Sequence, residues 1–383
     1  MAIREIVAGV PVRLVGLLVL AHVAFTGCRF TLMLFAVSLK ASEIEIGLLM
    51  GLIMVFPMLF AVRAGQWCDQ YGYVRPTALA LILLISAGGV AGFIPHMSGL
   101  YMASILVGSG FMLTMIAVNN AIGQATTSTR LTQSFSVMTM GFSLSGILGP
   151  VIAGFMIDHF GHASAFLILT LFALAALVQL TVARRHHLDS PQEPRPNVTN
   201  VIDLVWREPM RSVFIVSAVI SMAWDLFMFL APLHGARIGL SATAISMIVG
   251  AYGVGTFMIR GLLPMITASL SIWRMTSICL FVTAACYLIF PLATTLFFLL
   301  PAAMAMGLAL GGGQPMALSL VHQTAPPSRS GEAAGARSTI TSASQTFLPL
   351  VFGALGSAVG VLAVFWIGAL FLIAGGVFAR QRE

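Results

Sequence analysis

The chain has 383 residues, of which 59% are hydrophobic and only 8% are charged, with a formal net charge of +7 and a mean hydropathy of +1.00. So few charges exclude a water-soluble globular domain, and most of the surface is expected to face lipid. The four cysteines show no paired spacing, which predicts neither a disulfide framework nor a metal site.

Twelve apolar stretches are each long enough to cross a bilayer, which takes about 20 helical residues. In the first half we predict helices over 12–38, 45–64, 76–97, 99–122, 131–157 and 162–183. In the second half we predict helices over 211–233, 243–266, 273–293, 295–321, 335–358 and 361–379. The first stretch is long enough to span, so we expect no cleavable signal peptide. Polar residues 184–210 predict a cytoplasmic linker that ends in a short interfacial helix near 201–211.

The two halves are related by an internal repeat with an offset of 199 residues. The step relates Ser42 to Ser241, Gly51 to Gly250, Arg75 to Arg274, Pro150 to Pro349, Gly154 to Gly353, Gly161 to Gly360 and Phe166 to Phe365. Fused copies of one membrane unit are typical of transporters with a site between the halves. The sequence therefore predicts an all-α membrane protein with six-helix bundles over 1–183 and 211–383.

The basic residues indicate how the chain is oriented. With both termini in the cytoplasm, nearly all arginines fall on the inner side, and the outer side holds only Lys40 and Arg237 against Glu43, Glu45 and Asp158. This distribution follows the positive-inside rule, so the net charge reports topology and not nucleic-acid binding. We expect a multi-pass protein in the lipid bilayer with both termini cytoplasmic.

The loop after the second predicted helix reads Gly65-Gln-Trp-Cys-Asp69-Gln-Tyr-Gly72-Tyr-Val-Arg75. It resembles the loop signature of the major facilitator superfamily, although Gln70, Tyr73 and Val74 replace the usual basic residues. Gly65 allows close helix contact and Gly72 allows a tight turn. The resemblance implies that Asp69 docks on the start of helix 335–358 and closes the cytoplasmic side, with Arg75 in the same network. A generic tight loop is the alternative.

Two further stretches are similar to segments of that superfamily. Gly331-Glu332-Ala-Ala-Gly335-Ala-Arg337 resembles a stretch common in its bacterial members, so we expect Glu332 and Arg337 to serve the cytoplasmic gate. The fifth predicted helix resembles the pattern of the drug:proton antiporters, with small residues in place of some glycines; the matching positions are Ser145, Gly149, Pro150, Ala153 and Gly154. Small residues let helices approach closely and proline bends them. The pattern favours export over import, although packing glycines in any transporter would look much alike.

Two charged residues lie deep in predicted spans, where an ionised side chain costs about 2.5 to 3.5 kcal/mol. Arg29 is related by the repeat to Met228, three residues from Asp225. The two charges therefore differ in depth by roughly 4.5 Å if the halves are equivalent. We expect Asp225 to couple transport to protons, with Arg29 as its partner or as an anchor for an anionic substrate. A permanent structural ion pair is the alternative.

Polar or aromatic side chains on several spans are weaker candidates for lining a cavity: His22, Thr26, Trp224, Tyr252, Gln314 and Gln345. His22 could titrate near neutral pH, but an interhelical hydrogen bond is the more ordinary role. The amides of Gln314 and Gln345 sit in spans, where they must find polar partners.

The resemblance implies a twelve-helix major facilitator fold and proton-coupled export of a small organic molecule across a bacterial inner membrane. We expect a monomer without cofactors, with protons and a small molecule as its ligands. One alternative is a proton-coupled symporter that imports an anionic metabolite. Another is a sensor or assembly subunit that no longer transports. No nucleotide-binding loop, metal cluster or nucleophile arrangement suggests an enzyme.

Overall fold

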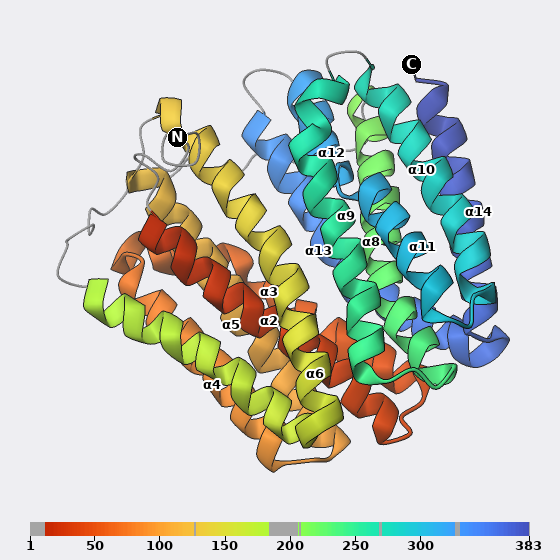
Figure 1. Cartoon of the computed structure of the whole chain (residues 1–383). Coiled ribbons are helices and arrows are strands. Elements are labelled where there is room, and N and C mark those ends of the chain that lie inside the picture. Colours follow the sequence, from red (N-terminus) through yellow and green to blue (C-terminus); the bar gives the residue numbers. More distant parts are fainter. Residues whose placement is uncertain are drawn as a thin grey trace. The chain divides into compact units, whose positions relative to one another are not determined.

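The computed structural model describes residues 12–125, 128–183, 206, 208–267, 270–325 and 330–382. Every regular element in these ranges is a helix (Figure 1), as predicted from the apolar stretches. Most of the predicted linker and of its interfacial helix lies outside the described residues.

The first half consists of α2 (Val12–Ser38), α3 (Glu43–Tyr71), α4 (Val74–Phe93), α5 (Met97–Ala125) and α6 (Ser128–Ala183). At 1.5 Å per residue, the 56 residues of α6 are far too long for one crossing of a hydrocarbon core about 30 Å thick. Gly161 interrupts α6 with φ 82° and ψ 171°. Glycine is favoured at a positive φ because it has no Cβ. Thus α6 comprises the two crossings predicted over 131–157 and 162–183.

The second half consists of α8 (Met210–Arg237), α9 (Ala242–Thr267), α10 (Ile272–Ile289), η1 (Phe290–Leu292), α11 (Leu296–Leu310), α12 (Gly313–Thr324), α13 (Ser330–Val359) and α14 (Val361–Arg380). Gly360 separates α13 from α14 with φ 86°, which matches its repeat mate Gly161. The structure contains eleven apolar segments of membrane-spanning length in its described part. Counting the two crossings of α6 separately gives the twelve that the sequence predicts.

One predicted span is not continuous. The stretch 295–321 is divided into α11 and α12 by Gly311 and Gly312. Pro315 lacks the N–H that would bond the carbonyl of Gly311, and two glycines add backbone freedom at that point. The break therefore leaves a helix end and a helix start inside one span.

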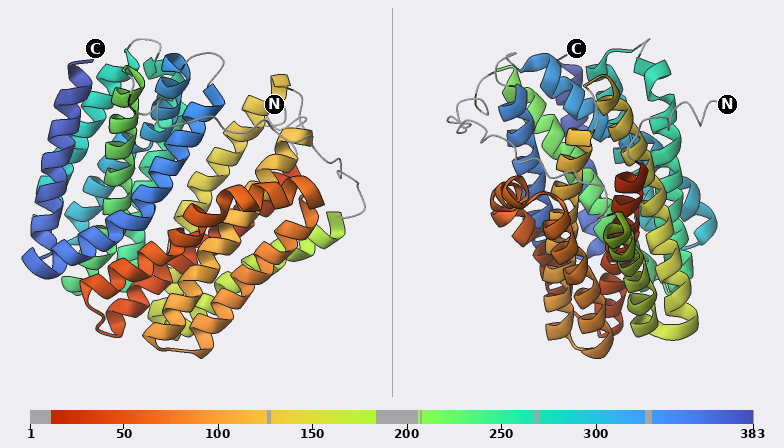
Figure 2. Two further views of the ribbon diagram at one scale, coloured as in Figure 1. Left: turned by 180° about the vertical axis from the view of Figure 1, so that it is seen from behind. Right: turned by 90° about the vertical axis from the view of Figure 1, so that its left-hand side faces the viewer.

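The contacts divide the chain into two compact units. Unit 1 comprises Met1–Ala41, Leu52–Pro194 and Ser241–Ser246, and unit 2 comprises Ser42–Gly51, Arg195–Leu240 and Met247–Glu383. In unit 1, α2 packs along α6 and α5, and α4 packs on both of these helices (Figure 2). In unit 2, α8 packs on α13, α12 and α14, and α10 packs along α14 (Figure 1).

The repeat-related helices α2 and α8 are the most enclosed of the membrane-length helices described. Large apolar side chains elsewhere are exposed, such as Leu59, Leu370 and Phe297, as expected of surfaces that face lipid. Arg29 and Asp225 therefore lie on the central helix of their respective units, where a charged side chain requires a specific environment.

Close helix crossings recur at repeat-related glycines. In unit 2, a Cβ on Gly353 of α13 would lie 2.4 Å from the carbonyl oxygen of Glu43, in the first turn of α3. In unit 1, a Cβ on Gly154 of α6 would lie 2.6 Å from the carbonyl oxygen of Ala242, in the first turn of α9. Each pair is shifted from the other by 199 residues. The repeat thus reproduces a backbone contact that only glycine permits.

Candidate functional site

The buried carboxylate of Asp225 lies in the middle of α8, where its residue is only 1% exposed. It is within electrostatic range of the hydroxyl groups of Tyr252 on α9 and Tyr287 on α10. Tyr287 donates its hydroxyl to the carbonyl of Ala223 at 2.5 Å. Phe227 stacks on Tyr252, with ring centroids 4.7 Å apart. Two predicted candidates, Asp225 and Tyr252, are thus brought together, and the sequence analysis missed Tyr287.

The other central charge, Arg29, is partly buried on α2 of unit 1. The expected meeting of Arg29 with Asp225 involves both units, so it remains a prediction. Trp224 precedes Asp225 on α8 and is partly buried, as is Gln345 on α13.

In unit 1, His22 and Thr26 on α2 bind the same residue of α6. His22 Nδ1 lies 2.5 Å from Ser145 Oγ, and the Thr26 hydroxyl donates to the Ser145 carbonyl at 3.1 Å. The imidazole also lies against Phe111 and Phe142, at centroid distances of 5.1 and 4.5 Å. Through these hydrogen bonds between α2 and α6, Ser145 connects the cavity candidates His22 and Thr26 to the helix-5 motif.

The rest of the helix-5 motif is tightly packed. A Cβ on Gly149 would lie 2.2 Å from Thr26 Oγ1 and 2.8 Å from the backbone nitrogen of Gly27. Ala153 is completely buried, and Pro150 lies inside α6. The close approach of helices that the small residues predicted is therefore present at Gly149, as it is at Gly154.

The predicted gate loop forms a tight turn. Between α3 and α4, Gly72 has φ 71°, and Arg75 is exposed in the first turn of α4. Asn120 of α5 donates its amide to Asp69 Oδ1 at 3.2 Å. The expected close helix contact at Gly65 is not seen among the described residues, because a Cβ there would meet no atom within 4 Å.

In unit 2, the amide of Gln314 lies at the centre of a polar network. Arg337 of α13 donates to Gln314 Oε1, and Gln314 Nε2 donates to Ser221 Oγ of α8 at 3.4 Å. Ser221 Oγ also lies 3.4 Å from Thr341 Oγ1 of α13. Arg337 was expected near the cytoplasmic gate together with Glu332, whose side chain lies outside the described residues.

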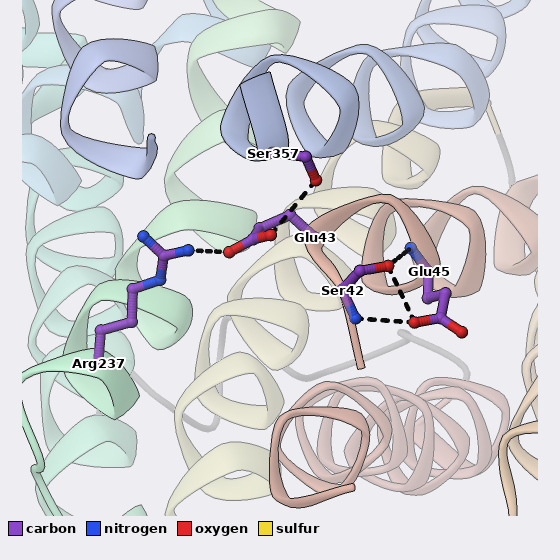
Figure 3. Close-up of polar contacts among 5 residues, drawn as sticks. All are labelled: Ser42, Glu43, Glu45, Arg237 and Ser357. Atoms are coloured by element: carbon purple, nitrogen blue, oxygen red, sulfur yellow. Dashed lines mark hydrogen bonds and ion pairs between the residues drawn. The ribbon is translucent and has the colours of Figure 1, made fainter. Parts of the chain in front are cut away.

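The start of α3 is held by two carboxylates of its own first turn (Figure 3). Glu45 Oε2 accepts the Ser42 backbone N–H at 2.8 Å, and Ser42 Oγ accepts the Glu45 N–H at 3.3 Å. This is a capping box. Glu43 pairs with Arg237 at the end of α8 and accepts the Ser357 hydroxyl at 3.3 Å (Figure 3). The start of α3 is thereby fixed within unit 2.

The start of α9 is capped from another helix. Ala244 stands where the repeat has Glu45, so α9 has no capping-box carboxylate of its own. Asp158 of α6 supplies one, since its two oxygens accept the N–H groups of Ala242 and Thr243 at 2.9 and 2.8 Å. A carboxylate at this position satisfies two unpaired donors and faces the positive end of the helix dipole.

Replacing Asp158 with alanine is therefore expected to destabilise the protein by about 1 kcal/mol, the ordinary cost of a lost N-terminal cap. The measurement is the apparent melting temperature of the purified protein in detergent, at a fixed heating rate. His159 follows Asp158 and its ring bonds to the carbonyl of Phe155 in its own helix, so His159→Ala is the matched control and should change little. An equal loss in both variants would contradict the capping role.

No group of three or more His, Cys, Asp or Glu side chains that could hold a metal ion occurs within the described residues. The four cysteines are free thiols.

Comparison with known proteins gives a consistent picture. The family model described as Major Facilitator Superfamily matches residues 14–296 and 213–382. A Bacillus subtilis (strain 168) protein named uncharacterized MFS-type transporter YuxJ is 22% identical over 346 residues, which cover 86% of each chain. Multidrug resistance protein 2 of the same organism is 25% identical over 179 residues, which cover 44% of each chain.

Solved structures share the fold at low sequence identity. A POT family transporter in complex with 5-aminolevulinic acid aligns with a TM-score of 0.78 at 14% identity, covering 96% of both chains. A bacterial homolog of the human lysosomal transporter Spinster, in an inward-facing and occupied conformation, aligns with a TM-score of 0.75 at 13% identity. That alignment covers 97% of this chain and 94% of the other.

Proposed function

Because this chain belongs to the Major Facilitator Superfamily, and is thus a transporter and not an enzyme, we propose that it exports a small organic molecule in exchange for protons. The protein would work by alternating access, as a multi-pass monomer of a bacterial inner membrane with both termini cytoplasmic. The transport class follows from the family. The direction, the coupling ion and the orientation are our proposal.

The burial of Asp225 is the observation that supports the proposed proton coupling. It is the one acidic side chain among the buried residues of the described ranges, and it lies halfway along a membrane helix. Such a carboxylate is costly when ionised without compensation, so intramembrane acids commonly mark proton pathways. Tyr252 and Tyr287 lie within electrostatic range of this carboxylate, and the Tyr287 hydroxyl is held by its bond to the carbonyl of Ala223. Arg29 is its proposed partner across the pathway.

Export is supported by α6 and by one relative. The close packing of Gly149 and Gly154 around Pro150 fits the resemblance to the drug:proton antiporters. The relative named Multidrug resistance protein 2 points in the same direction, although the match covers under half of the chain. Uptake of an anionic metabolite by proton symport is the second candidate, because Arg29 is a partly buried cation that could bind a carboxylate.

The cytoplasmic gate is proposed to include Gly72, Asp69 and Arg75 on the first loop. The bond from Asn120 to Asp69 holds the carboxylate in position on α3. From there Asp69 would dock on the start of α13 when the cytoplasmic side closes, through the favourable interaction of an anion with a helix N-terminus.

Direction and coupling can be tested in inside-out vesicles that carry the protein and have an acidified lumen, with a pH-sensitive dye. A panel of lipophilic drugs and organic acids would be added in turn at the cytoplasmic face. Antiport predicts that at least one compound evokes proton release from the lumen. Uptake in right-side-out vesicles that increases as the outside is acidified, without any such release, would instead establish symport.

A further inference from the structure

The guanidinium of Arg337 lies within a span, near its start, and bonds to a neutral partner in the described part of the chain. Its guanidinium donates to Gln314 Oε1, and its Nε atom is buried with no hydrogen-bond partner among the described residues. No carboxylate of the described part forms an ion pair with it. A buried cation is normally paired, because desolvation of the charge is otherwise uncompensated. Among the described side chains, therefore, no carboxylate neutralises the positive charge of Arg337.

The break in the α11–α12 span adds to this positive potential. At the end of α11, Arg260 Nε donates to the carbonyl of Gly311 at 3.4 Å, so a cation meets the negative end of a helix. At the start of α12, by contrast, a cation lies near the positive end of a helix. Gln314 lies in the first turn, Gly312 provides no side-chain cap, and Pro315 has no N–H. Arg337 is hydrogen-bonded to that first turn through Gln314, so its positive charge lies at the positive end of the α12 dipole.

The side chains that extend the network from Gln314 are neutral hydrogen-bonding groups. Thr341 lies one turn further along the same face of α13, and Ser221 bonds to the amide of Gln314. The span in α13 is the least apolar and the least buried of those described. Ser338 and Thr339 on α13 are exposed. A polar and exposed face on a membrane helix fits contact with water better than contact with lipid.

We propose that Arg337, with Gln314, Thr341 and Ser221, binds an anionic group of the transported molecule, most simply a carboxylate. A carboxylate would neutralise the guanidinium, accept its unused donors and face the positive end of α12. Binding at this site defines the substrate class as organic anions, for export or for uptake. The identification of the bound anion as the transported molecule rests on the proposed transport function. Anion binding itself can be measured without any proton gradient.

The site predicts opposite effects for two arginines on the stability of the ligand-free protein. Arg337→Met removes a charge that no described carboxylate neutralises, so the apparent melting temperature in detergent should rise by about 2 °C. Arg260→Met is the matched control, because it removes the donor to the free carbonyl of Gly311 and should lower the melting temperature. If Arg337 were only a brace between α12 and α13, both variants would lower it.

Anion binding itself can be measured with sodium benzoate, with benzamide as the neutral analogue and with sulfate and chloride as further anions. Benzoate should raise the melting temperature of the wild type and of Arg337→Lys, and benzamide should not. The shift should disappear in Arg337→Met and persist in Arg380→Met, which removes an exposed cation from the last turn of α14. A shift that persists in Arg337→Met would overturn the proposal, as would a melting temperature lowered by that substitution. The absence of any anion-dependent shift in the wild type would overturn it equally. None of these outcomes depends on the direction of transport or on proton coupling.

Discussion

Replacing Asp225 with asparagine is expected to abolish substrate-evoked proton release in inside-out vesicles while the protein still folds and inserts. Asparagine has nearly the same size and keeps hydrogen-bonding groups, so the packing around Tyr252 and Tyr287 can persist. The asparagine amide cannot take up and release a proton as a carboxylate does, so transport would no longer be coupled to protons. We expect the rate to fall at least tenfold, which corresponds to about 1.4 kcal/mol.

The matched controls are carboxylates outside the centre of a span. Glu45→Gln and Asp158→Asn alter the helix caps at the starts of α3 and α9. These substitutions should therefore affect stability and leave substrate-evoked proton release present. Full proton release in Asp225→Asn would instead reduce Asp225 to a structural partner of Arg29. Melting temperatures of all three variants, taken in parallel, separate loss of coupling from loss of fold.

The spans were predictable because hydropathy reports a property of each segment by itself. The first predicted helix, 12–38, coincides with α2, and its repeat mate differs from α8 by only a few residues at each end. Length alone separates the two crossings of α6, and Gly161 marks their junction through its positive φ. The internal repeat paired Gly161 with Gly360, and the structure shows a positive φ at both.

Contacts between helices were less predictable, because they depend on rotation and on depth that no single segment specifies. Arg337 lies at the start of the predicted helix 335–358, and the resemblance assigned it to the cytoplasmic gate. In the structure α13 begins at Ser330, and Arg337 binds Gln314 across to α12. A polar run from Ser338 to Thr346 was the available signal, because such a run is unusual in a helix that faces lipid.

The two capped helix starts show how the repeat can mislead. Ser42 and Ser241 are equivalent by sequence, and both occupy the first position before a helix. Yet the carboxylate that caps α3 comes from Glu45 in its own first turn, whereas the one that caps α9 comes from Asp158 on a different helix. The carboxylate that α9 does not have in its own first turn is supplied by α6, and the offset of 199 residues does not reveal this.

The second large effect is expected at the crossing of α13 with the start of α3. At Gly353 even one methyl group would lie 2.4 Å from the carbonyl oxygen of Glu43 and 3.2 Å from the Cα of Gly47. The first turn of α3 cannot easily give way, because Glu43 is held by Arg237 and Ser357. Backbone atoms in such a contact must move apart, and overpacking of this kind costs about 1 to 3 kcal/mol.

Gly353→Ala should therefore lower the apparent melting temperature by several degrees and reduce transport, since α3 belongs to unit 2 up to Gly51 and to unit 1 from Leu52 onward. Displacing its start would shift a helix that both units share. Gly356→Ala is the matched control one turn away, where the nearest atom, in the Glu43 side chain, would be at an ordinary 3.5 Å. Alanine is the better helix former by roughly 0.5 to 1 kcal/mol, so the control should be neutral or stabilising. Equal melting temperatures for the two variants would show that α3 and α13 can separate at this crossing without cost.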